Sequence, residues 1–173
     1  MRRITLIITA MLLSIAAFAQ KTYDTEFTQT KVMKVSGKTI NKVGHLVFDG
    51  NEQLSMTYSD PEGDYFIIEG NNVKINMEGN TTELDADKVK RVKLQRATLL
   101  NCLSDNWEQA AEDNNADLTI TENDGLKTVS IIAKGKVQRG GYKSVELTYG
   151  SDGMMTKMVL EDAAGVINTY EIK

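Results

Sequence analysis

Apolar and polar residues alternate in short runs from residue 22 to the C-terminus, and Gly, Asn and Asp separate the runs. A period of two places successive side chains on opposite faces of a β-strand, so each run predicts a strand with one apolar face. The separating segments, such as residues 60–63 and 70–72, predict tight turns, and strands joined in this way form an antiparallel meander. The predicted strands include residues 44–49, 53–59, 65–69, 73–77, 117–121, 126–133, 145–149, 155–161 and 166–172.

One segment, residues 87–114, has the helical period instead. Its apolar positions recur at steps of three and four residues, and Lys, Gln, Glu and Asn fill the other positions. This pattern predicts a single amphipathic helix. Because neither element can leave its apolar face in water, we expect the helix to lie against the open face of the sheet.

The parity of the apolar positions predicts which side chains share the concave face of the sheet. Residues 65–68 are mostly apolar at both parities, so Ile67 is an alternative to its neighbours there. The predicted cavity residues are Leu46, Phe48, Leu54, Met56, Tyr58, Phe66, Ile68, Val73 and Ile75 from the strands, and Leu99, Leu100, Leu103 and Trp107 from the helix.

The N-terminus has the layout of a secretory signal peptide. Arg2 and Arg3 precede an apolar stretch at residues 4–18, and small residues at 17 and 19 suit a signal peptidase. We therefore expect residues 1–19 to be a signal peptide that is cleaved before Gln20. The alternative, an uncleaved anchor, is disfavoured because the apolar stretch is shorter than the roughly 20 residues that a membrane-spanning helix needs.

Length and charge narrow the class of protein. The remaining residues 20–173 suit one domain with a substantial core. The formal net charge of −4 argues against a nucleic-acid partner, since such proteins carry a basic surface. Cys102 is the only cysteine, so no disulfide can form within the chain.

Few residues have the chemistry of an active site. His45, the only histidine, lies within a predicted strand, and we expect it on the strand surface rather than in a catalytic or metal site. Cys102 is expected in or near the core. The acidic spacing at residues 113–124 lacks the glycine of a calcium loop. We expect no enzymatic activity, no metal and no cofactor.

Several short segments, taken in order, resemble the periplasmic outer-membrane lipoprotein carrier family (LolA type). The resemblance covers most of the chain. The segments are Phe27-Thr28-Gln29-Thr30, Gly44-x-Leu46 with Phe48, Leu54 and Met56 ahead of Asp60-Pro61, Glu69-Gly70-Asn71-Asn72-Val73, Ser104-Asp105-Asn106-Trp107, Gly150-Ser151-Asp152-Gly153, and Asp162 and Gly165 before Thr169-Tyr170-Glu171-Ile172.

The resemblance implies an α+β, mainly β fold: an incomplete antiparallel β-barrel, or half-barrel meander, with a helical lid over its concave face. It also implies a periplasmic, non-enzymatic carrier or chaperone that holds acyl chains of lipoproteins or lipids in transit toward the outer membrane. Its partners would be the cargo and the envelope membrane proteins that donate or accept it, and we expect a monomer. The eight methionines suit irregular acyl chains or a packed core equally.

The chain departs from the carriers in three places. Gly50 stands where the carriers have an arginine that guards the cavity, and only residues 20–26 are available for their first helix. The carriers also continue into a further strand where this chain has Lys173. The resemblance therefore implies the fold more directly than the handover of lipoproteins. An envelope lipid sensor that signals to a protein partner is the alternative function.

Overall fold

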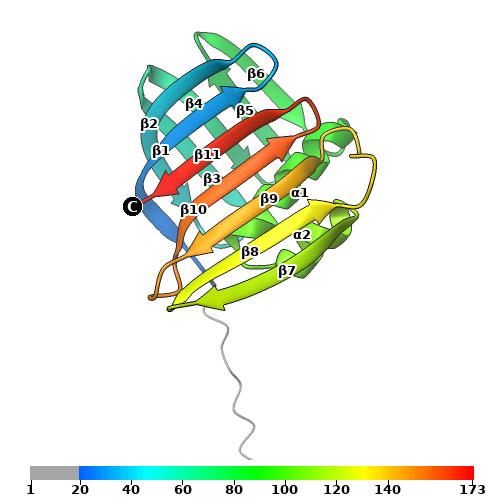
Figure 1. Cartoon of the computed structure of the whole chain (residues 1–173). Helices are drawn as coiled ribbons and strands as arrows, with labels where there is room; N and C mark the ends of the chain where they lie inside the picture. Colours follow the sequence, from blue (N-terminus) through cyan, green and yellow to red (C-terminus); the bar gives the residue numbers. More distant parts are fainter. Residues whose placement is uncertain (1–19) are drawn as a thin grey trace, which may run out of the picture.

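The computed structural model describes residues 20–173, and the expected signal peptide at residues 1–19 lies outside this part of the chain. The described residues form one 11-stranded antiparallel sheet and two helices. Figure 1 shows that the sheet is strongly curved and that both helices lie on its inner side. The elements are β1 (Tyr23–Met33), β2 (Lys38–Phe48), β3 (Gln53–Asp60), β4 (Glu62–Glu69), β5 (Asn72–Met77), β6 (Asn80–Asp85), α1 (Lys90–Leu103), α2 (Trp107–Asp113), β7 (Ala116–Asn123), β8 (Leu126–Ala133), β9 (Tyr142–Tyr149), β10 (Met155–Asp162) and β11 (Val166–Ile172).

The strand order is β6-β5-β4-β3-β2-β1-β11-β10-β9-β8-β7. The chain winds from β1 outward to one edge, crosses the concave side through α1 and α2, and returns from the other edge to pair β11 with β1. In that pair Phe27 lies opposite Ile172. The edge strands β6 and β7 do not pair with each other in the described structure, so the barrel is incomplete. This architecture confirms the fold that the sequence predicts.

The prediction of a single helix is wrong, because residues 104–106 separate α1 from α2. Asp105 has a positive φ of 59°, a left-handed conformation that Asp tolerates better than most residues and that cannot continue a helix. The amide N–H of Asn106 then donates to the carbonyl of Asn101 and closes the end of α1. Strand β6 is also absent from the predictions, because its sequence is polar at almost every position and does not alternate.

The core lies between the concave face of the sheet and the helices. All predicted cavity residues are buried in this core or pack against it, the partly buried ones being Phe66, Ile75 and Trp107. The second half of the sheet also contributes many buried side chains to this core. Its buried core side chains are Val129, Ile131, Val145, Leu147, Tyr149, Met155, Met158, Leu160 and Ile172.

Gly44 allows β2 to pack closely against its neighbours β1 and β3. A Cβ atom at this position would clash with the carbonyl oxygen of Thr57 and would lie 2.8 Å from Cζ of the fully buried Phe27. We expect Gly44→Ala to lower the free energy of unfolding by about 1–3 kcal/mol, the usual cost of overpacking. Urea denaturation measures this change. Val43→Ala, at the exposed neighbouring position, is the control, and an equal loss in both variants would contradict the explanation.

Asp64 is a buried acid beside the core. Its carboxylate lies 2.5 Å from Nζ of Lys42 and accepts a 2.7 Å hydrogen bond from the amide N–H of Glu78. Both interactions hold the pKa of Asp64 below its usual value, with the Lys42 contact as the larger cause. The ionised form is therefore the one that the folded protein favours.

A lowered pKa in the folded state stabilises the protein above the unfolded pKa of about 4, and this stabilisation is lost as the pH falls through the folded value. We expect Asp64→Asn to be less stable than the parent protein at pH 7 and the difference to shrink below about pH 4. Asp124→Asn, in an exposed turn, serves as the control. A difference that stays constant from pH 7 to pH 3 would contradict this role.

Candidate functional site

The contact between α1 and the sheet is apolar and tightly packed. A crevice beneath α1 has a volume of about 10 Å³, barely the space that one water molecule requires. This crevice therefore has no space for an acyl chain as long as the helices keep the position that they have in this structure. The crevice is lined by Phe27, Leu46, Leu54, Met56, Leu99, Leu103, Met158, Tyr170 and Ile172.

The structure brings part of the predicted cavity together at this crevice. Five of its lining residues are predicted cavity residues: Leu46, Leu54, Met56, Leu99 and Leu103. Leu100 and Trp107 line a different, larger pocket, and the other predicted residues lie elsewhere in the core. Their binding of a ligand stays a prediction.

Sequence reasoning missed the crevice residues of the first strand and of the last two. Phe27, Met158, Tyr170 and Ile172 reach the crevice because β11 pairs with β1 and β10 pairs with β11. Alternation places each of these residues on a face of its own strand, but it does not say that the first and last strands are neighbours. Long-range strand order is the information that was missing.

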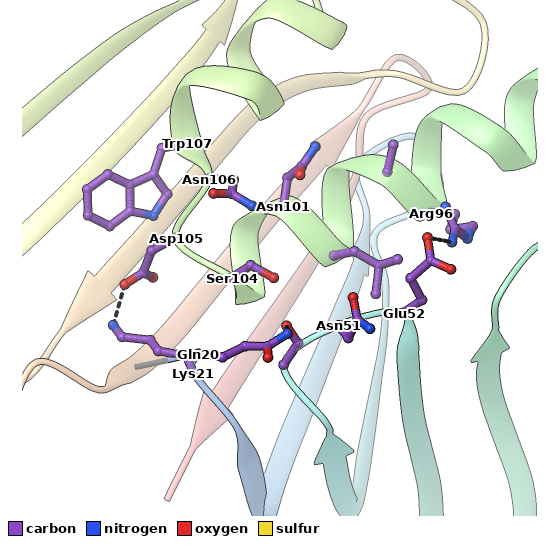
Figure 2. A pocket seen from close by; sticks show the side chains of 13 residues that line it. Gln20, Lys21, Asn51, Glu52, Arg96, Asn101, Ser104, Asp105, Asn106 and Trp107 are labelled. Carbon is purple, nitrogen blue, oxygen red and sulfur yellow. Dashed lines mark hydrogen bonds and ion pairs between the residues drawn. The ribbon is translucent and has the colours of Figure 1, made fainter. Parts of the chain in front are cut away.

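A second, larger pocket lies at the end of the sheet where the chain enters β1. Its volume is about 940 Å³, and we call it the polar pocket (Figure 2). The walls come from the segment before β1, the β2–β3 connection, α1, the α1–α2 connection and the start of α2. The lining residues are Gln20, Lys21, Gly50, Asn51, Glu52, Arg96, Ala97, Leu100, Asn101, Ser104, Asp105, Asn106 and Trp107.

A chain of polar contacts ties the α1–α2 connection to the sheet. Asp105 pairs with Lys21, and the hydroxyl of Tyr149 donates a 2.9 Å hydrogen bond to the same carboxylate. Trp107 Nε1 donates to the Tyr149 hydroxyl at 2.8 Å. Burial, followed by the nearby Asp105 carboxylate, raises the pKa of Tyr149, so its proton stays available for this contact. These contacts hold Asp105 in the conformation that ends α1.

Arg96 joins the middle of α1 to the first half of the sheet, at the turn between β4 and β5. Its Nε donates a 2.6 Å hydrogen bond to the carbonyl of Gly70 in the β4–β5 turn, and its Nη2 lies 3.2 Å from Glu52. Gly50, on the facing β2–β3 connection, has a positive φ, and a Cβ there would lie 2.6 Å from Cγ of Gln20. The arginine that lines the pocket belongs to α1.

Buried polar contacts also join the two helices to each other. Nδ2 of Asn114, at the end of α2, donates to Oγ1 of Thr98 in α1 at 2.8 Å. Oδ1 of Asn114 accepts the amide N–H of Tyr142 at 3.3 Å, at the start of β9. Thr98 is fully buried and Asn114 nearly so. Because buried polar groups lose free energy when they are unpaired, these contacts favour movement of α1 and α2 as one unit.

Two further chemically distinctive residues, Cys102 and His45, lie outside the crevice and the polar pocket. Cys102 is fully buried, which confirms its predicted place in the core, and burial raises the pKa of its thiol to about 12. The partly exposed His45 lies 2.7 Å from Asp24 on the neighbouring strand, as expected of a residue on the strand surface. Within residues 20–173, no group of three His, Cys, Asp or Glu side chains is arranged to hold a metal ion. No helix in this part of the chain has both the length and the hydrophobicity to cross a membrane.

Cys102 reports on whether the helices leave the sheet. We expect a thiol reagent at pH 8 to label the native protein at least about 100-fold more slowly than the unfolded chain, since only an opened form presents the thiol. Labelling in increasing urea should begin before far-UV circular dichroism records the loss of the sheet, because helix opening exposes less surface than global unfolding. Coincident labelling and unfolding would show that the helices do not open separately.

Comparison with known proteins gives one family match and several solved structures of low sequence identity. A family model of the outer membrane lipoprotein carrier protein LolA matches residues 19–173. No curated protein sequence matches the chain. A solved LolA superfamily protein from Nitrosomonas europaea is 11% identical, with a TM-score of 0.42 over 90% of this chain and 85% of that one. The lipoprotein LppX from Mycobacterium tuberculosis is 10% identical, with a TM-score of 0.40 over 90% and 87%. The MucA/MucB complex from Pseudomonas aeruginosa contains a chain that is 11% identical, with a TM-score of 0.45 over 88% of this chain and 50% of that one. Because the family model covers nearly the whole chain, the protein belongs to the outer membrane lipoprotein carrier protein LolA family.

Proposed function

We propose that this protein is a non-enzymatic periplasmic carrier or chaperone that binds acyl chains of lipoproteins or lipids between its helices and the concave face of its sheet. The observation that carries the proposal is the apolar contact between α1 and the concave face of the sheet. This contact contains the crevice lined by Leu99 and Leu103, and we call it the apolar seam. Both sides of this seam are apolar, and its crevice leaves almost no free volume. An acyl chain that enters the seam takes the place of the helix side chains, so the inner face of the sheet keeps apolar contacts.

The free energy of such binding comes from apolar surface. Burial contributes about 25 cal/mol per Å², so an acyl chain that buries 300 Å² gains roughly 7 kcal/mol before the cost of opening the helices. Met56 and Met158 line the crevice, and their flexible thioether side chains adapt to irregular chains. The same side chains also fill the closed core.

The helices are attached in a way that permits opening as a unit. Asn114 and Thr98 hold α1 and α2 together, whereas Arg96 and the Lys21–Asp105 pair hold them to the sheet at the polar pocket. The side chains of these attachments are largely buried, with Lys21 21%, Asp105 23% and Arg96 13% exposed, but they line the polar pocket. Water that enters this pocket replaces the contacts when they break and so reduces the free-energy cost of opening.

The proposal also includes transport of the bound cargo toward the outer membrane. It is supported by membership of the LolA family and by the signal peptide that the sequence predicts. The cargo would arrive from one envelope membrane protein and leave to another. The exchange requires no chemical step, since opening of the helices alone exposes the acyl chains.

Trp107 provides a direct test of acyl binding, because it is the only tryptophan and lies at the start of α2. We expect an uncharged long-chain monoacylglycerol, added below its micelle concentration, to shift the Trp107 emission in a saturable manner. Opening of the helices changes the hydrogen bond from Trp107 to Tyr149 and therefore the surroundings of the indole.

Leu103→Asp should abolish this response, because it places an unpaired charge in the seam. Leu99→Gln is a milder second variant for which we expect weaker binding. Gln109→Asp adds the same charge on the exposed side of α2 and should leave the response unchanged. Circular dichroism checks that each variant is folded. An emission spectrum that no acyl probe alters would contradict the proposal.

A further inference from the structure

The polar pocket contains a largely buried cation, Arg96, whose hydrogen-bonding capacity is not fully used. We propose that the polar pocket is a binding site for a phosphate-bearing ligand, held by Arg96, with Glu52 as the internal group that the phosphate displaces. This site is distinct from the apolar seam, and the inference goes beyond the proposed binding of acyl chains.

The donors of Arg96 are unequally used. The side chain is 13% exposed, and its Nε donates a 2.6 Å hydrogen bond to Gly70. Its Nη2 atom is buried and has no hydrogen-bond partner, the only buried side-chain nitrogen or oxygen in residues 20–173 for which this is true. An unpaired buried donor is costly, and the cost is greater when the group is charged.

Glu52 compensates the charge of Arg96 only weakly. Its carboxylate lies 3.2 Å from Nη2, within range of an ion pair but without the geometry of a hydrogen bond. The Glu52 side chain is 61% exposed on the β2–β3 connection, so solvent competes for its carboxylate. A phosphate brings several acceptor oxygens and matches the planar guanidinium better than this single contact does. Movement of Glu52 into solvent frees the place that the phosphate takes.

The other charged residues of the pocket are committed to each other. Asp105 pairs with Lys21 and accepts the hydroxyl hydrogen of Tyr149, so it neither repels an anion strongly nor releases Lys21 to bind one. Figure 2 shows these two pairs on separate sides of the pocket, with Asn51, Asn101 and Ser104 between them. The Asn51 amide and the Ser104 hydroxyl are neutral donors for the remaining phosphate oxygens. Nδ2 of Asn101 already donates one hydrogen bond to Asp113 at 3.3 Å, which leaves its second N–H for a ligand.

The dimensions and composition of the pocket favour a phosphate ester over the bare ion. The volume of about 940 Å³ is many times that of phosphate alone, and Leu100 and Trp107 supply an apolar part of the wall. Two kinds of ligand contain such a phosphate ester: a lipid with a phosphate head group and a free water-soluble ester. The polar pocket lies next to the crevice, because Leu100 lines the pocket and the adjacent Leu99 lines the crevice.

Isothermal titration calorimetry at low salt tests the site with three probes: inorganic phosphate, glycerol 3-phosphate and dihexanoylphosphatidylglycerol below its micelle concentration. We expect Arg96→Gln to weaken binding by at least about tenfold, because the charge-assisted hydrogen bonds are lost. Glu52→Gln should strengthen binding several-fold, because it removes the competing carboxylate. Arg91→Gln, an equal loss of charge at an exposed position of the same helix, should have little effect.

The two opposite effects keep the test independent of folding, since damage to the structure does not strengthen binding. Binding of glycerol 3-phosphate equal to that of the lipid identifies a free ester as the source, and binding of the lipid alone identifies a head group. Either result supports the site if the variants behave as expected. No binding of any probe, no gain in Glu52→Gln, or equal losses in Arg96→Gln and Arg91→Gln would overturn it. The response of Trp107 to an uncharged monoacylglycerol tests the acyl site separately, so either proposal can fail alone.

Discussion

Burial of the apolar side of α1 against the concave face of the sheet is the interaction on which the rest of the structure depends. The sheet is not closed, because β6 and β7 form separate edges, and its inner face would otherwise be open to water. Leu99, Leu103 and the fully buried Cys102 cover that face. The helices also form the connection between the two edges. Removing this contact would expose the core of both halves of the sheet at once.

The polar contacts around this seam differ in what they stabilise. The buried contacts of Asn114 join the helices to each other and to β9, and they are costly to break. The contacts at the polar pocket are more exposed and join the helices to the sheet through Lys21 and Arg96. In the opening that we propose, this distribution would keep the helices together and release them at the end that lines the polar pocket. That property is what a carrier of acyl chains requires.

Most strands and their inward-facing residues could be predicted from the sequence because alternation is a local property. The polar strand β6 does not alternate and could not be predicted in this way. Leu46, Leu54 and Met56 are in the core as expected. The break in the helix at Asp105 could not be predicted from periodicity, since contacts from Lys21 and Tyr149, both distant in sequence, stabilise it. The polar pocket was also missed, because its lining residues come from segments that are distant in the sequence.

Native mass spectrometry of the protein, purified from an envelope fraction without detergent, tests the central claim most directly. The account predicts that part of the population carries additional masses that match acyl-bearing lipids or lipopeptides, and that the milder variant Leu99→Gln carries fewer of them while remaining folded. A protein that is always free of such masses, even after incubation with acyl donors, would contradict the claim that the seam beneath α1 is a binding site.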